Sequence, residues 1–177
     1  EYGFYASDIT RTWPTNGRFS KAQRELYDIV LAAQLECIGK AAVGVAYDVI
    51  HQAAVQVITD GLLSLGLLKG SLKKNIESAA YKKFYMHKTG HWIGLDVHDV
   101  GEYKLGGSSR LLEPGMVFTV EPGLYIAPGT PGVPDKYQGI GIRIEDDVLM
   151  TAKGPEVISD GVPKTVDAIE SLMASAR

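Results

Sequence analysis

The spacing of the apolar residues changes near residue 85, and this change limits the fold class. Apolar residues recur every three or four positions before it and every second position after it. Ser20, with Gln23 three residues later, predicts a helix start with a capping box. Two further helices are predicted at about 47–64 and 72–81. The first half of the chain should therefore be mainly helical.

Strands are predicted on both sides of this helical region. Tyr5 to Trp13 is rich in aromatic and β-branched residues, and Met116 to Glu121 and Gly139 to Met150 follow in the glycine-rich second half. A last helix is predicted from Thr165 to Ala176. An order of one strand, two or three helices and then mostly strands predicts an α+β fold.

Length and charge exclude several classes of function. With 177 residues and 45% hydrophobic content, the chain can bury one real core. Its net charge of −3 shows no basic face, so we expect no nucleic-acid partner. The apolar runs are shorter than the ~20 residues of a membrane helix. The single cysteine, Cys37, allows no internal disulfide and is compatible with the cytoplasm, the expected location.

Five polar residues stand in strand-like or glycine-rich surroundings: Asp8, His91, His98, Glu121 and Glu145. Glu121 ends an apolar run and precedes a Pro-Gly pair. A carboxylate there is costly to bury unless it is paired or ligates a metal. Glu145 shares a strand face with Arg143, two residues before it. An Arg–Glu pair on a solvated sheet face is the simpler interpretation of that pair.

The histidines strengthen the case for a metal site. His87 and His91 are four residues apart, but Lys88 stands where a zincin has glutamate, and Thr89-Gly90 disfavours a helix. The run from His91 to Gly101 contains two histidines, two aspartates and two glycines, a density that isolated core histidines do not explain. Carboxylates with one imidazole form an oxygen-rich set that suits Mn²⁺. Carboxylates that bridge two ions hold them roughly 3.5–4 Å apart, an arrangement used for amide hydrolysis.

Four ordered segments carry a resemblance to a known family: residues 7–14, 91–99, 121–125 and 141–147. Together they resemble the pita-bread metallopeptidases, which include methionine aminopeptidase, prolidase and aminopeptidase P. The amino-acid sequences of the four segments are most similar to those of bacterial aminopeptidase P. The resemblance implies the creatinase/aminopeptidase fold, a curved antiparallel sheet covered by helices. It also implies release of an N-terminal residue that precedes proline, by attack of a hydroxide activated by two metal ions.

The resemblance also implies roles for individual residues. The implied metal ligands are Asp8, His91, Glu121 and Glu145. Glu121 is further implied in moving a proton between the attacking water and the leaving amine. His87 and His98 are implied in binding or polarising the peptide carbonyl. Arg143 is implied in supporting the acidic ligands.

One departure from the family concerns the start of the chain. The family has an earlier aspartate ligand, which would lie before Glu1. We therefore expect residues 1–177 to be a partial C-terminal catalytic domain, N-terminally truncated, with an incomplete second metal site and impaired activity. Peptides with proline at the second position are the expected partners, and a homo-oligomer is possible.

Two alternatives to aminopeptidase P remain. One is prolidase, which cleaves dipeptides that end in proline. The other is a pita-bread protein without metals that serves as a peptide-binding module. Retention of Asp8, His91, Glu121 and Glu145 disfavours the metal-free module. The sequence around Trp92 and Asp96 disfavours methionine aminopeptidase.

Overall fold

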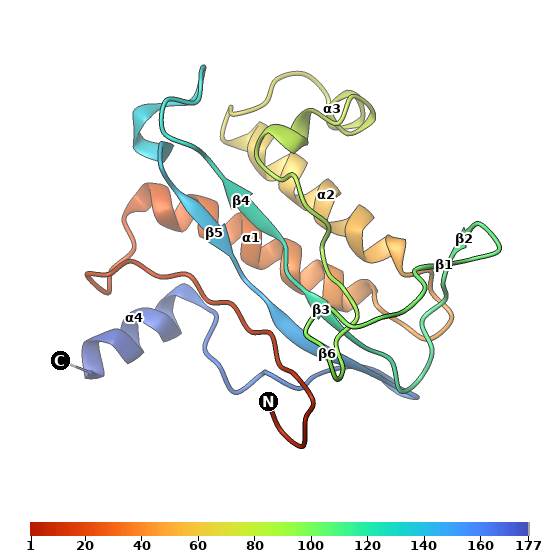
Figure 1. Cartoon of the computed structure of the whole chain (residues 1–177). Coiled ribbons are helices and arrows are strands. Elements are labelled where there is room, and N and C mark those ends of the chain that lie inside the picture. The colour runs from red at the N-terminus through yellow and green to blue at the C-terminus, as the bar shows by residue number, and fades with distance from the viewer. Residues whose placement is uncertain (177) are drawn as a thin grey trace.

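The computed structural model describes residues 1–176 as one layer of helices against a layer of short antiparallel strands (Figure 1). The α-helices are α1 (Lys21–Lys40), α2 (Asp48–Ser64), α3 (Leu72–Glu77) and α4 (Val166–Ser175), and the 3₁₀ turns are η1 (Ala80–Lys83) and η2 (Asp135–Tyr137). The strands are β1 (Lys104–Leu105), β2 (Ser108–Ser109), β3 (Val117–Val120), β4 (Gly123–Tyr125), β5 (Gly141–Arg143), β6 (Asp146–Thr151) and β7 (Gly154–Val157). The predicted α+β class is confirmed.

Helix α1 starts where the sequence predicts. The Ser20 hydroxyl accepts a hydrogen bond from Gln23 N–H, and the Gln23 side chain accepts one from Ser20 N–H, so two amides at the helix start are satisfied. Helix α2 packs against it very closely at Gly61. A Cβ added there would lie 2.7 Å from Ile29 Cγ1, so a larger residue would push the two helices apart.

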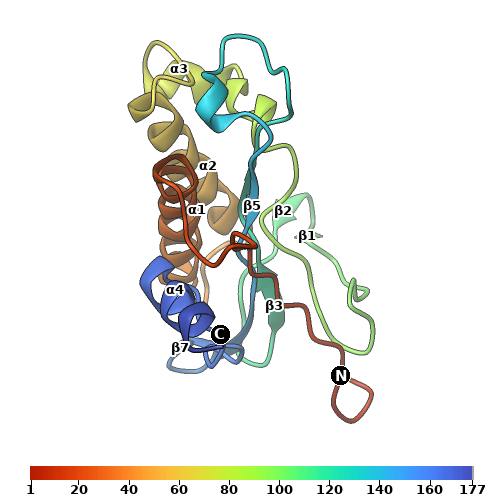
Figure 2. The same ribbon diagram turned by 90° about the vertical axis from the view of Figure 1, so that its left-hand side faces the viewer.

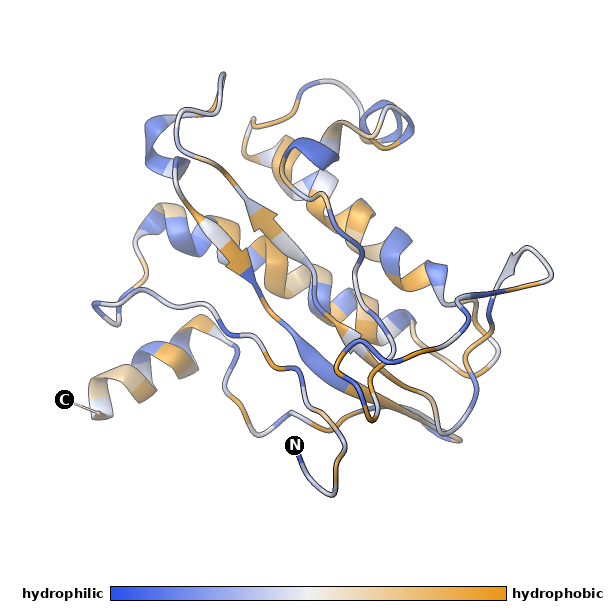
Figure 3. Cartoon of the chain, viewed as in Figure 1, coloured by the Kyte–Doolittle hydropathy of each residue, from blue (hydrophilic) through white to orange (hydrophobic). Residues whose placement is uncertain are grey.

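The main core lies between these two helices and the strands. Side chains from both layers are almost completely buried: Leu26, Val30, Ala54, Ile58, Leu62, Phe118, Leu124 and Ile144. Helices α1, α2 and α4 cover one face of the strand layer, while the N-terminal segment and the loop before β1 lie on the other (Figure 2). Apolar residues are concentrated in β3 and in the middle of β6, whereas the start of β6 is hydrophilic (Figure 3).

Three expectations about strands and helices need correction. Residues 5–13 form no regular strand; the backbone ladder of this segment with the strand layer is limited to a single bridge between Thr10 and Glu145. The predicted helix at 72–81 is divided, because Ala79 adopts a left-handed conformation (φ 53°) between α3 and η1. The strand predicted at 139–150 is interrupted between β5 and β6.

No helix among the described residues is both long and apolar enough to cross a membrane.

Candidate metal centre

The interruption of the strand ladder brings two glutamates together. Antiparallel pairing runs from Val117 to Val120 with β6, stops, and resumes with β5 at Gly123. Pro122 lies in the gap and has no N–H to give to a ladder. Glu121 and Glu145 occupy this gap on facing strands, so a local break in regular pairing positions both carboxylates.

The N-terminal segment adds a third carboxylate from far along the chain. Thr10 and Glu145 pair through both backbone hydrogen bonds, 3.0 Å from Glu145 N to Thr10 O and 3.4 Å in return. Asp8 N–H donates to the Asp147 carboxylate at 3.2 Å. These contacts hold the Asp8 side chain over the strand layer, where its Oδ2 lies 3.4 Å from His91 Nε2.

Arg11 fastens the same segment to β6. Its guanidinium donates to the carbonyl of Glu145 at 2.7 Å and to Asp146 Oδ1 at 2.7 Å. Asp146 is fully buried and also accepts from Lys164 at 2.8 Å. Burial alone would raise the pKa of Asp146, but the hydrogen bonds from Lys164, Ser159 and Arg11 outweigh it and lower that pKa. Arg11 and Lys164 therefore hold Asp146, the residue directly after Glu145, in place.

His91 is oriented by its neighbours. Its Nδ1 lies 2.9 Å from the carbonyl of Trp92, a contact that orients the ring and turns Nε2 towards the acidic side chains. Nε2 faces Glu121 Oε1 at 3.5 Å. The Thr119 hydroxyl accepts from His91 N–H and donates to Glu121 Oε1, so one hydroxyl positions both groups.

Two sets of ligand atoms are compact enough to hold a cation. The atoms of His91, Glu121 and Glu145 lie within 4.8 Å of one another, and so do those of Asp8, His91 and His98. Glu145 is almost completely buried, and its Oε1 finds no hydrogen-bond partner among residues 1–176. Burial, together with the Glu121 and Asp8 charges, raises the pKa of Glu145. A buried carboxylate with an unpartnered oxygen, near an imidazole Nε2, fits a divalent cation.

The predicted pair between Arg143 and Glu145 is confirmed, but Glu145 does not lie on a solvated sheet face. The Arg143 guanidinium is 3.4 Å from Glu145 Oε2, as the shared strand face predicts, but the Glu145 side chain is only 1% exposed. The Thr10 hydroxyl donates to the same Oε2 at 2.5 Å and accepts from Arg143 Nη2 at 2.9 Å.

His87 and His98 flank the acidic cluster differently. The His98 ring lies edge-on to His91, with 4.3 Å between centroids, and is exposed to solvent. His87 stands further along, where its Nε2 lies 2.8 Å from the Tyr125 hydroxyl. The structure thus places His98 within reach of the possible ligands and His87 beside a tyrosine, outside both compact sets.

Several residues in contact with the cluster were not singled out from the sequence: Thr10, Thr119, Tyr125 and Asp147. Thr10 follows Asp8 by two positions, and Thr119 precedes Glu121 by two. In extended chain, residues two apart share a face, so this spacing was the available signal. Asp147 had no comparable signal, because its role depends on pairing with Asp8, 139 positions away.

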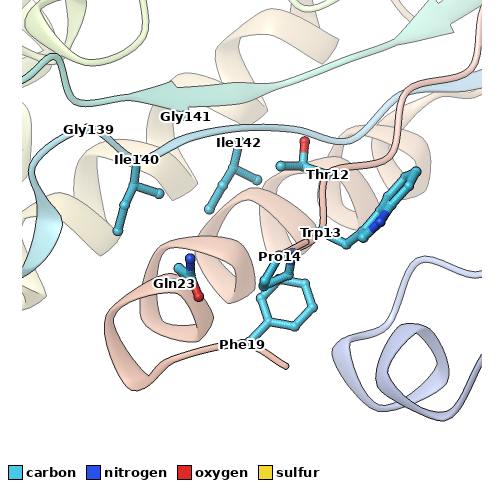
Figure 4. Close-up of a pocket in the computed structure, with 9 residues that line it drawn as sticks. All are labelled: Thr12, Trp13, Pro14, Phe19, Gln23, Gly139, Ile140, Gly141 and Ile142. Carbon is cyan, nitrogen blue, oxygen red and sulfur yellow. The ribbon is translucent and has the colours of Figure 1, made fainter. Parts of the chain in front are cut away.

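A surface cavity beside β5 is separate from this cluster (Figure 4). It is lined by Thr12, Trp13, Pro14, Phe19, Gln23, Gly139, Ile140, Gly141 and Ile142. None of the predicted metal ligands or substrate-binding histidines lines it.

Comparison with known proteins agrees with this geometry. The model of metallopeptidase family M24 matches residues 1–152. Xaa-Pro aminopeptidases of Escherichia coli and Haemophilus influenzae are 50% and 49% identical over 100% and 98% of the chain, which spans 40% of each relative. A solved structure of Pseudomonas aeruginosa aminopeptidase PepP is 57% identical over 98% of this chain and 39% of its own, with a TM-score of 0.97. A zinc-substituted E. coli aminopeptidase P in complex with product is 50% identical over 100% of this chain and 40% of its own, with a TM-score of 0.95.

Proposed function

The chain belongs to metallopeptidase family M24, and from that premise we propose that the whole protein is an Xaa-Pro aminopeptidase, which removes an N-terminal residue preceding proline. The observation that carries the proposal is the convergence of Asp8, His91, Glu121 and Glu145, with His91 common to both compact sets of ligand atoms. The pita-bread fold of the structural relatives and the names of the similar proteins support the same reaction. The chain spans about 40% of those relatives. We accordingly propose that residues 1–177 are part of a catalytic domain.

We propose that divalent ions, two of them and Mn²⁺ in preference, are held by Asp8, His91, Glu121 and Glu145. Three carboxylates and one imidazole make an oxygen-rich set that suits this ion. When bound, such ions lower the pKa of a water molecule and polarise a carbonyl group. His91 Nδ1 is held by a carbonyl, so Nε2 is the atom available to a metal.

The remaining roles belong to the chain's own side chains. Glu121 would move a proton from the attacking water to the leaving amine, because its carboxylate is half-buried beside His91. His98, exposed next to His91, would donate to the carbonyl oxygen of the scissile bond. His87 would bind the substrate beside Tyr125. Arg143 and Thr10 would hold Glu145 in place.

The substrate would be a peptide with a free amine and proline at the second position. A tertiary Xaa-Pro amide has no N–H, and the proline ring restricts the backbone, so a pocket shaped for that ring selects against ordinary peptides. Location in the cytoplasm and assembly into a homo-oligomer stay predictions.

The decisive experiment compares two substrate classes on the whole protein. We expect kcat/KM to be higher for Xaa-Pro-Zaa tripeptides than for Xaa-Pro dipeptides. A clear preference for dipeptides would assign the protein to prolidase and leave the metal site untouched. If the whole protein bound such peptides but bound no metal and cleaved neither substrate class, the metal-free binding module would be favoured instead.

A further inference from the structure

A buried hydrogen-bonded chain connects helix α2 to the loop that carries the histidines. The Thr89 hydroxyl lies 2.8 Å from His51 Nδ1 and 2.5 Å from the Tyr85 hydroxyl. Thr89 is 1% exposed and so is Tyr85, so water cannot readily replace these contacts. His51 is on α2. The three side chains therefore join the helical layer to residues 85–91.

Thr89 is placed to transmit this contact to the candidate metal centre. It stands two residues after His87 and two before His91. Its backbone carbonyl accepts from Glu121 N–H at 2.7 Å. The side chain of Thr89 is thus held by α2, and its main chain is hydrogen-bonded to Glu121.

The surroundings leave the loop little freedom to move. A Cβ added to Gly90 would lie 2.0 Å from the carbonyl oxygen of Thr119, so the loop main chain presses directly on β3. The Tyr85 ring packs edge-on against His87, with 5.1 Å between centroids. A shift of Thr89 would therefore displace His87, His91 and Glu121 together.

We propose that His51 is a positioning residue for the metal centre: through the Thr89 hydroxyl it fixes the loop that holds His91 and the main chain of Glu121. The proposal rests on the proposed metal-binding function. Neither His51 nor Thr89 would touch metal or substrate. Neighbours of metal ligands of this kind typically change metal affinity by about 10–100-fold when they are removed.

The test is a Mn²⁺ titration of the whole protein by calorimetry. Thr89→Val keeps the shape and removes the hydroxyl, and it should weaken Mn²⁺ binding at least about tenfold. Thr89→Ser should restore most of the affinity. His51→Phe should weaken binding as Thr89→Val does, and His51→Asn should recover part of it. Both variants break the contact between His51 and Thr89, and Thr89→Val also removes the one to Tyr85, so the double variant should bind about as weakly as Thr89→Val alone.

Thr59→Val is the matched control. Thr59 is a fully buried threonine of α2 whose hydroxyl donates to the carbonyl of Val55, away from the loop. It should lower the melting temperature and leave Mn²⁺ affinity unchanged. Equal Mn²⁺ affinity in wild type, Thr89→Val and His51→Phe would overturn the proposal.

Hydrogen exchange separates failure of this proposal from failure of the proposed function. The Glu121 amide should exchange faster in His51→Phe, while the Met150 amide, which bonds Met116 in the sheet, should not change. If the wild-type chain bound no metal, the metal-site proposal would fail, and the Glu121 amide would still decide whether His51 positions the loop. Unchanged Glu121 exchange in the variant would overturn it.

Discussion

The Thr10 hydroxyl donates to Glu145 Oε2 at 2.5 Å, although 135 positions separate the two residues. This bond satisfies one oxygen of a carboxylate whose other oxygen has no partner within residues 1–176. Thr10→Val should therefore lower the free energy of unfolding by about 1–3 kcal/mol. It should also weaken Mn²⁺ binding about 10–100-fold. Urea denaturation and calorimetry measure the two effects.

Thr10→Ser is the control for shape, since it keeps the hydroxyl and loses only a methyl group. It should bind Mn²⁺ nearly as wild type does. Wild-type affinity in Thr10→Val would show that the bond to Glu145 is irrelevant to the metal.

His91 and His98 should differ in their effect on metal binding. His91 Nε2 faces two carboxylates, whereas the His98 ring is exposed at the edge of the cluster. His91→Ala should lower Mn²⁺ affinity more than tenfold, and His98→Ala should change it less than about threefold. In the whole protein, His98→Ala should instead reduce kcat roughly 10²–10³-fold. An equal loss of metal affinity in both variants would make His98 a ligand.

The helices could be predicted from the sequence because their signals are local. The Ser20 and Gln23 cap and the apolar spacing that follows lie within a few residues of one another. The interruption at Glu145 could not be predicted in this way. It depends on Pro122 lying opposite in the ladder, which is a long-range pairing. In the sequence, Ile140, Ile142 and Ile144 alternate up to Glu145, and no proline within residues 139–150 marks the interruption.

The candidate site shows the same division. Asp8, His91, Glu121 and Glu145 could be named because each stands in a distinctive motif, and the structure brings them together. Their roles as metal ligands stay predictions. Asp147 and His51 could not be found, because each acts through a residue distant in sequence, Asp8 and Thr89 respectively.

Asp146 should be important for stability. It is fully buried between Arg11 and Lys164, so Asp146→Asn would leave two buried cations without their anion. Breaking such a pair costs about 3–5 kcal/mol of unfolding free energy, measurable by urea denaturation. The pKa of Asp146 is lowered in the fold, so its stabilisation is present above the unfolded value and declines as pH falls through the folded one.

Asp167→Asn is the matched control for that measurement. Asp167 pairs with Arg24 at 3.1 Å, but its side chain is 88% exposed. Exposed pairs contribute about 0–1 kcal/mol. Equal costs for the two substitutions would contradict a special role for the buried pair.

Glu121→Gln should remove most activity from the whole protein while it retains the side-chain shape. The amide cannot carry the proton, and general acid–base catalysis is typically worth about 10²–10⁴ in rate. We expect kcat for Xaa-Pro-Zaa peptides to fall by at least about 10², measured at saturating Mn²⁺ so that weaker metal binding is not the cause. A variant that changed only KM would show that Glu121 contributes uniform binding.

His51 should make the stability of the chain depend on pH between about 4 and 6.5. Burial of its ring, together with the nearby charges of Lys88, His87 and Lys82, lowers the pKa of His51 to about 4, whereas the unfolded chain titrates near 6.5. Above 6.5 the ring is neutral in both states and its contribution is complete. As pH falls towards 4, only the unfolded state gains the proton, so stability is lost.

Solvent around the half-buried His51 ring screens these charges, so the slope of unfolding free energy against pH should stay below the roughly 1.4 kcal/mol per pH unit of one full proton. Other groups titrate in this range, and the measured quantity is therefore the difference between wild type and His51→Asn in urea denaturation at several pH values. Parallel curves for the two proteins would show that His51 titrates normally in the fold.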